Sequence, residues 1–240
     1  MPDALFEHPR LAALYDSLDR DRSDLEVYAL IAAELGARSA LDIGCGTGTF
    51  ALMLADRGLE VTGVDPAAAS LEVAQRKPGA ERVRWINGDA TTLPRLAVDL
   101  ATMTGNVAQA IVDEVDWHGT LRGAHEALRP GGRLVFETRD PAREAWREWH
   151  DESHEIVEID DVGPVEHWGE LVEVSLPLVT FRWTFVFPEG ERLTSVSTLR
   201  FRERDEVQSA LVDHGYVLDE VRDAPDRPGR ELVFIARRPV

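Results

Sequence analysis

Short runs of hydrophobic residues alternate, over the first 140 residues, with segments whose hydrophobic positions recur every three to four residues. The short runs predict buried strands, and the recurring spacing predicts amphipathic helices. Strands are expected at 39–43, 60–65, 83–89, 98–106 and 133–139, and helices at 10–18, 25–35, 49–57 and 113–128. This order predicts an α/β fold, a doubly wound, Rossmann-like sheet that is mostly parallel and has helices on both faces.

The alternation breaks at about residue 150, where hydrophobic and polar side chains begin to alternate one by one. Phe181, Trp183, Phe185 and Phe187 share one face of a predicted strand, 188–191 forms a turn, and 193–201 returns. We therefore expect a small antiparallel β insertion after the fifth strand. Its aromatic face could bind a substrate, cover the core or contact a second subunit, and all three interpretations remain open.

The last segment predicts a helix at 205–214 and two strands at 216–221 and 232–237, which bring the main sheet to seven strands. The chain of 240 residues is expected to form one domain. Its parts are an N-terminal helical lid (1–36), a ligand-binding core (37–149), the insertion (150–203), and a C-terminal helix and strand pair (204–240).

The most informative motif is LDIGCGTGTF at 41–50, where the first strand runs into the next helix. Its glycines let the backbone turn sharply and approach a ligand. Asp65 ends the second strand, 21 positions after Gly44 (65 minus 44), and Asp89 ends the third. The carboxyl ends of parallel strands share one edge of the sheet, so these groups are expected to meet in one crevice.

These motifs resemble those of the class I S-adenosylmethionine-dependent methyltransferases. The LDIGCGTG corner, the GVD strand end, the NGDA turn and the LRPGGRLVF segment occur in that family's order, over roughly residues 35 to 140. The resemblance implies that the cofactor is S-adenosyl-L-methionine, with S-adenosyl-L-homocysteine as product. It also implies transfer of a methyl group to nitrogen or oxygen of a small-molecule acceptor.

The resemblance assigns nine positions to the cofactor. Gly44, Cys45 and Gly46 would line its methionine part, Asp65 with the adjacent Pro66 would hold the ribose, and Asp89 with Ala90 would meet the adenine. Thr104 would face the methyl group, and Tyr15 would reach the carboxylate end. Each acid could instead be a solvated turn or a helix cap, and Tyr15 could simply pack the lid onto the core.

The acceptor is expected to contact residues near the fourth strand and the insertion. The candidates are Asn106, Arg139, Trp146, His150, Trp168 and Trp183. Arg139 could pair with a substrate carboxylate, although a salt bridge with one of the 44 acids is the commoner role of an arginine. One histidine among His150, His154 and His167 could act as a general base, and the pattern does not single out a catalytic residue.

Two other functions share parts of this pattern. An NAD(P)-binding oxidoreductase would use G-x-G-x-x-G, whereas this corner is G-x-G-x-G, with Thr49 where Gly or Ala is expected. A non-catalytic module that binds S-adenosylmethionine for regulation could keep the same corner and Asp65.

The charge restricts the acceptor further. The formal net charge of −18 disfavours nucleic acid as a partner, because binding to phosphates needs a basic surface. Nine acids lie between Asp151 and Glu173, and Arg147 to Arg182 encloses no Lys or Arg. Such a segment favours neutral or cationic acceptors, while the insertion could also support a homodimer.

The remaining composition points to a cytoplasmic protein without a metal site. Cys45 is the only cysteine, so neither an internal disulfide nor a multi-cysteine metal site can form. No signal peptide precedes the first predicted helix, and no apolar run reaches membrane length. The single lysine, among 26 basic residues, is typical of a bacterial genome rich in GC.

Overall fold

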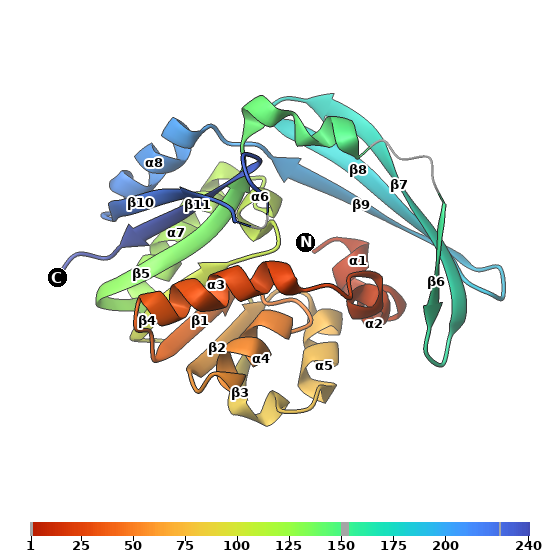
Figure 1. Ribbon diagram of the computed structural model, residues 1–240, viewed down its shortest axis with the longest axis horizontal. Coiled ribbons are helices and arrows are strands. Elements are labelled where there is room, and N and C mark those ends of the chain that lie inside the picture. The colour runs from red at the N-terminus through yellow and green to blue at the C-terminus, as the bar shows by residue number, and fades with distance from the viewer. Residues whose placement is uncertain (1, 150–153, 226) are drawn as a thin grey trace.

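Seven strands form the main sheet, in the order β10-β11-β5-β4-β1-β2-β3 (Figure 1). The structure is a computed structural model that describes residues 2–149, 154–225 and 227–240. The bounds are β1 (Ser39–Ile43), β2 (Glu60–Asp65), β3 (Val83–Asn87), β4 (Val98–Met103), β5 (Leu128–Arg139), β10 (Val217–Asp223) and β11 (Glu231–Arg237). The first five strands run parallel and β11 runs antiparallel to both of its neighbours, which confirms the predicted fold class.

The strand order reverses at β1. From β1 the chain continues outward through β2 and β3, and then returns to place β4 on the other side of β1. Ligands of open α/β sheets bind at such a reversal, outside the carboxyl ends of the strands. The glycine corner after β1 and residues 104–106 after β4 therefore lie at the same crevice.

Helices cover both faces of the main sheet. The bounds are α1 (Ala4–Glu7), α2 (Pro9–Leu18), α3 (Ser23–Glu34), α4 (Thr49–Asp56), α5 (Ala68–Arg76), α6 (Val107–Ala110), α7 (Glu114–Ala127) and α8 (Arg204–Asp213), with short 3₁₀ helices η1 (Ala80–Arg82), η2 (Pro141–Arg143) and η3 (Ala145–Glu148). Trp117, Leu121 and Val207 of α7 and α8 pack on one face, and Tyr28 and Phe50 of α3 and α4 pack on the other.

The segment after β5 forms a second, antiparallel sheet that arches over the carboxyl edge of the first (Figure 1). Its strands are β6 (Glu155–Ile159), β7 (Gly163–Ser175), β8 (Leu178–Val186) and β9 (Arg192–Arg200), paired in that order. The predicted hairpin is confirmed as β8 and β9. The strands β6 and β7 extend it on one side.

The first two helices lie beneath this second sheet (Figure 1). Leu11 and Leu14 of α2 pack with Phe185 and Phe187, and the Arg10 guanidinium lies 3.7 Å from the centre of the Phe187 ring. The helix α3, by contrast, packs on the main sheet. Within the described residues, no helix combines the length and the apolar character that crossing a membrane requires.

Candidate functional site

The glycine corner leaves its backbone open on one side. Gly44 has φ 70° and a Cβ there would lie 2.4 Å from Val107 Cγ2, so the turn has no room for a side chain. Gly46 has φ 53°, and a Cβ built on it would meet nothing within 4 Å. A ligand can therefore approach the backbone at Gly46. Glycine adopts this left-handed backbone conformation without strain.

Asp65 ties the second strand to this corner. Its Oδ2 accepts a hydrogen bond from Gly46 N at 2.8 Å, and its Oδ1 accepts one from Ala67 N at 2.7 Å. Burial raises the pKa of Asp65, while these two hydrogen bonds lower it. A carboxylate has about four lone-pair directions, so each oxygen can still accept a hydroxyl such as those of a ribose. The Asp65 carboxylate can therefore accept hydrogen bonds from the ribose hydroxyls of the cofactor that the resemblance implies.

The other cofactor candidates surround the same edge. Cys45 is buried against Gly63, and burial raises its pKa well above the usual range, so the thiol is neutral and fills space. Pro66 is exposed, and its carbonyl accepts from Asn87 Nδ2 at 3.2 Å. Thr104 is half-buried next to Gly105, which has φ 72° and open space around it.

Asp89 and Ala90 have contrasting surroundings. The Asp89 carboxylate is exposed and accepts from Thr91 N at 2.8 Å, which makes it a turn-forming side chain. Ala90 is 2% exposed, and its carbonyl carbon lies so close to Gly123 that a Cβ there would be 2.6 Å away. The position of Ala90 is therefore set by packing against α7.

The N-terminal helices meet the glycine corner through Asp16. Asp16 Oδ1 accepts from Thr47 Oγ1 at 2.7 Å, and Asp16 Oδ2 lies 2.6 Å from the Nζ of Lys77, the single lysine of the chain. Tyr15 is half-buried beside Phe6, at 5.5 Å between ring centres, and burial raises its pKa. Tyr15 was predicted to reach the cofactor, and its neighbour Asp16 carries the polar contacts to the glycine corner and Lys77, which no local pattern indicated.

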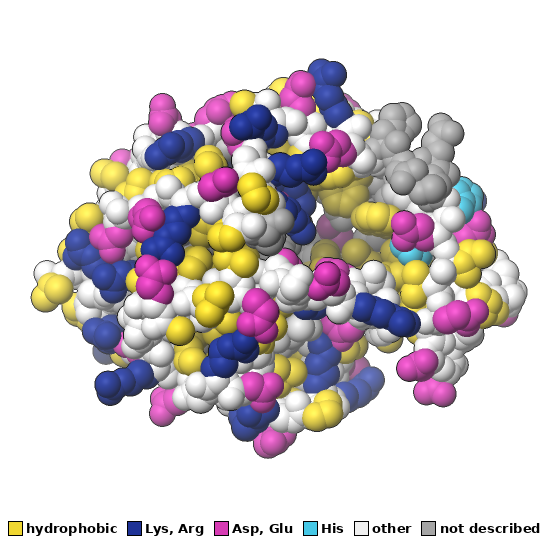
Figure 2. Space-filling model, viewed as in Figure 1, with side chains coloured by type: hydrophobic (Ala, Val, Ile, Leu, Met, Phe, Trp, Pro, Cys, Tyr) yellow, Lys and Arg dark blue, Asp and Glu magenta, His cyan; other side chains and the backbone are white. Residues whose placement is uncertain are grey.

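A cavity of about 400 Å³ lies between the two sheets, and we call it the inter-sheet cavity. Figure 2 shows a hollow in the molecule, between the part built on the main sheet and the second sheet. The polar side chains that line the cavity include Asn106, Arg139, Glu148, Glu155 and His167. The aromatic side chains that line it are Trp149, Trp168, Phe181 and Trp183.

The structure brings four of the six predicted acceptor residues to this cavity, namely Asn106, Arg139, Trp168 and Trp183. Trp146 is 3% exposed and packs edge-on against Phe201, with ring centres 4.6 Å apart. His150 lies outside the described residues.

Asn106 is held by two side chains from the end of β5. It is a non-glycine residue with φ 70°, an uncommon conformation that surrounding contacts must stabilise. Its backbone N donates to Glu137 Oε1 at 2.9 Å, and its side-chain Oδ1 accepts from Arg139 Nη1. Burial raises the pKa of Glu137 to about 7. Arg139 also lies 3.4 Å from Glu231 Oε1, so it forms an ion pair while it lines the cavity.

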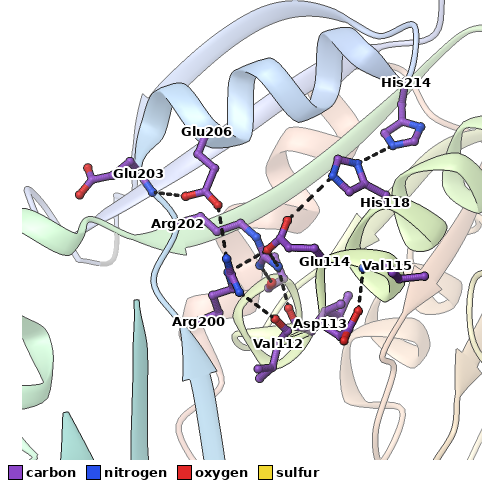
Figure 3. Close-up of polar contacts among 12 residues, drawn as sticks. Val112, Asp113, Glu114, Val115, His118, Arg200, Arg202, Glu203, Glu206 and His214 are labelled. Atoms are coloured by element: carbon purple, nitrogen blue, oxygen red, sulfur yellow. Dashed lines mark hydrogen bonds and ion pairs between the residues drawn. The ribbon is translucent and has the colours of Figure 1, made fainter. Parts of the chain in front are cut away.

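The loop that carries Asn106 is anchored to the second sheet by a charged cluster (Figure 3). Arg202 is 2% exposed and donates to the carbonyls of Ala108 and Ile111, at 3.0 and 2.9 Å. Glu114 at the start of α7 accepts from Arg202 and pairs with Arg200 at 2.8 Å. Arg200 at the end of β9 and Arg202, two positions further, therefore hold this loop at the cavity.

His167 differs from His154, the other described histidine of the insertion. It is 8% exposed, lines the inter-sheet cavity, and has no hydrogen bond on either ring nitrogen within the described structure. His154, in contrast, stacks on Trp168 at 4.1 Å and bonds to Glu166 at 2.6 Å. The residue pattern alone did not separate these histidines.

Comparison with known proteins agrees with this geometry. A family model described as a methyltransferase domain matches residues 40–132. The cypemycin N-terminal methyltransferase from a Streptomyces species is 33% identical over 109 residues, which cover 45% of this chain and 44% of that protein. The chain spans about half the length of the curated relatives it matches.

Solved structures extend the likeness to nearly the whole fold. An S-adenosylmethionine-dependent methyltransferase from Clostridium acetobutylicum has a TM-score of 0.78 at 18% identity, over 97% of this chain and 99% of that one. A sugar N-methyltransferase from Streptoalloteichus has a TM-score of 0.75 at 21% identity, over 94% and 93%. At these identities the likeness shows a shared fold.

Proposed function

We propose, from the premise that this chain belongs to the class I S-adenosylmethionine-dependent methyltransferases, that it transfers a methyl group to nitrogen or oxygen of a small molecule. One observation carries the proposal. The crevice at the strand reversal, with Gly46 and Asp65, adjoins a cavity lined by Asn106, and the next residue, Val107, lies against Gly44 of the glycine corner. A cofactor site and an acceptor site therefore adjoin at the end of β4.

The cofactor, when bound, supplies an electrophilic methyl group on a sulfonium. The chain itself contributes position and exclusion of water. Asp65 would hold the ribose hydroxyls, and the open backbone at Gly46 would lie along the methionine part. Asn106, fixed by Glu137 and Arg139, would set the floor on which the acceptor rests.

The N-terminal lid was predicted over residues 1–36, and we propose that α1 and α2 form it, because α3 packs on the main sheet. These helices pack on the second sheet through Leu11 and Leu14, and meet the glycine corner through Asp16. A segment with contacts on both sides can close the crevice once the cofactor is seated. The aromatic face of the insertion would then roof the acceptor, since Phe181 and Trp183 line the cavity.

The function is tested first by calorimetric titration with S-adenosylmethionine, S-adenosylhomocysteine and NADH. Asp65→Ala is expected to weaken binding of the sulfur cofactors at least about tenfold, because a hydrogen bond to a charged group is worth about 1.5–3 kcal/mol. Asp65→Asn, which keeps one oxygen acceptor, should lose less. Glu81→Ala, which removes an exposed acid of η1, is the matched control and should bind like wild type.

The second step measures release of S-adenosylhomocysteine with a panel of small amines, phenols and alcohols. Turnover with any of them supports the methyltransferase. Binding of NADH in place of the sulfur cofactors would support an oxidoreductase. Tight cofactor binding without turnover across the panel would support a regulatory module.

A further inference from the structure

His167 is a buried side chain of the cavity wall whose ring nitrogens make no hydrogen bond with the described residues. Buried polar atoms are nearly always hydrogen-bonded, yet both ring nitrogens of His167 have no partner within the described residues. The ring lies on β7, near Trp183 and Phe185, with 6.0 Å between ring centres in each case. Burial lowers the pKa of His167, so the ring is neutral near pH 7 and offers one nitrogen lone pair.

The carboxylate nearest to that ring belongs to Glu155. Its Oε2 lies 3.8 Å from His167 Nε2, and β6 places the two residues directly opposite each other in the sheet. Of the other acids at the cavity, Glu148 pairs with Arg230 at 2.6 Å and Glu170 with Arg182 at 3.9 Å. Among the residues described, Glu155 has no Lys or Arg as ion-pair partner, and because its side chain is 68% exposed, solvent screens its negative charge in part.

Among the described residues that line the cavity, Arg139 is the only arginine, and its guanidinium is already engaged. Arg139 contacts Glu231 and Asn106, and its guanidinium carbon lies 5.0 Å from the centre of the Trp149 ring. It therefore adds little net positive charge to the cavity. The rings of Phe181 and Trp183 supply aromatic surface, which attracts cations through its negative face.

We propose that the inter-sheet cavity binds the methyl acceptor as a cationic amine, and that His167 takes up the proton which this amine must lose. The proposal deepens the methyltransferase function above and rests on it for the chemical step. An ammonium nitrogen has no lone pair for attack, so its proton passes first to a His167 ring nitrogen. The imidazolium that results lies beside the Glu155 carboxylate, which stabilises it.

The free amine then attacks the methyl group. A nitrogen–carbon bond forms while the carbon–sulfur bond breaks, and the electron pair of that bond remains on sulfur as a thioether. The product is the N-methylated ammonium, and His167 returns its proton to solvent. Every proton and electron pair is accounted for without a further reagent.

Cation binding can be measured without methyl transfer. The probes are choline and its neutral isostere 3,3-dimethylbutan-1-ol, titrated calorimetrically into wild type without cofactor. Choline is expected to bind about tenfold more tightly than the alcohol, since a cation on aromatic faces with a nearby carboxylate gains roughly 1–2 kcal/mol. Equal affinities, or no heat from choline at concentrations where the alcohol binds, would overturn the proposal.

Variants at two acids test whether choline binds in the cavity. Glu155→Gln should lower the affinity for choline several-fold and leave that for the alcohol unchanged. Glu173→Gln, on the same sheet but exposed on β7 and absent from the cavity wall, is the matched control and should behave as wild type. A loss in Glu173→Gln equal to that in Glu155→Gln would mean that overall charge, and not the cavity, attracts the probe.

The role of His167 has its own readout in NMR. The His167 ring signal is identified by its disappearance in His167→Gln, and its pKa is followed with and without choline. The charged side chains that line the cavity with this ring are Glu155 from β6, Glu148 from η3, Glu170 from β7 and Arg139 from β5, and β8 lines it with Phe181 and Trp183. A bound cation should lower the pKa of His167 further, and the neutral alcohol should not.

The chemical step is tested with whichever amine supports turnover. His167→Gln should lower kcat/KM about a hundredfold at pH 7, and raising the pH toward the pKa of the amine should restore much of the rate. An unchanged pH profile in His167→Gln would assign the histidine to packing. Loss of cofactor binding would defeat the proposed function itself, whereas normal cofactor binding with no choline preference would defeat this inference alone.

Discussion

At the scale of single residues, two carboxyl groups beside the crevice are buried and have raised pKa values. Asp42 of β1 is 1% exposed and accepts from Thr102 Oγ1 at 3.0 Å, and burial raises its pKa to about 7. Glu137 behaves in the same way at the end of β5. Both groups lie in the main sheet next to the crevice, and both hold their protons more tightly in the folded chain than in the unfolded one.

This protonation gives a prediction for Asp42→Asn. The pKa of Asp42 is 3.8 in the unfolded chain and about 7 in the folded one. The stability that the protonated carboxyl gives the folded state is therefore complete below pH 3.8 and is lost as the pH rises through 7. The free energy of unfolding of the variant, relative to wild type, should therefore rise by roughly 3 kcal/mol between pH 4.5 and pH 8.

Urea denaturation at the two pH values measures this difference. Comparing it across pH removes any fixed cost of the new amide group, because that cost is the same at both values. A difference between variant and wild type that stays constant from pH 4.5 to pH 8 would show that Asp42 is ionised in the folded state.

At the scale of elements, the second sheet is attached to the main one through strand ends. The Arg200 and Arg202 side chains leave the end of β9 and meet Glu114 at the first residue of α7, while Glu203 and Glu206 form the capping box of α8 (Figure 3). Arg202 also covers the Trp117 ring at 4.5 Å. The cluster thus joins β9, α7 and the loop that carries Asn106.

Arg202→Ala should be strongly destabilising as a consequence. The change leaves the carbonyls of Ala108 and Ile111 without their donor, while Glu114 keeps its ion pair with Arg200, and an unsatisfied buried acceptor costs about 1–3 kcal/mol. Thermal and urea denaturation would measure the loss. Arg204→Ala, at an exposed position on α8, is the matched control and should change stability by less than about 0.5 kcal/mol. Similar losses in both variants would contradict the role given to the cluster.

At the scale of the whole molecule, the N-terminal helices connect the two sheets. They pack on the insertion through hydrophobic contacts and reach the main sheet through polar ones, chiefly Asp16 with Thr47 and Lys77. Since Lys77 follows α5 and Thr47 belongs to the glycine corner, Asp16 joins α2 to the end of α5 and to the glycine corner. The position of these helices should therefore govern how well the cofactor is held.

Lys77→Met tests this link. The variant keeps the length of the side chain but removes the charge, so the population with seated helices should fall and the apparent Kd for S-adenosylmethionine should rise by that fraction, about three- to tenfold. Calorimetry would measure the change. Arg76→Met, one position earlier and paired only with Glu72 at 3.2 Å among the described contacts, is the control. Equal affinities in wild type and Lys77→Met would mean that the helices stay seated without this ion pair.

Local pattern accounts for most of the fold. The strand predictions at 39–43 and 60–65 coincide with β1 and β2, and the aromatic alternation from Phe181 correctly predicted β8. The fifth strand was expected to begin at 133, but β5 begins at Leu128 and includes 129–132. Leu128 pairs with Val98 of β4, and the register then shifts before Leu100 pairs with Arg133. The neighbouring strand therefore sets where β5 begins, and the local pattern does not. The short helix α1 was missed, since four residues are too few for a periodic pattern.

The sequence by itself determined that the glycine corner and Asp65 would meet, because both lie at the ends of neighbouring strands. A glycine corner after one strand and an acid after the next must meet when parallel strands are neighbours. Only the tertiary structure decided the acceptor side. His167 and Glu155 acquire their relation from the pairing of β6 with β7, and the Asp16–Lys77 contact spans 61 positions (77 minus 16). Burial and partner choice between distant segments set their chemistry, and neither property is local to the chain.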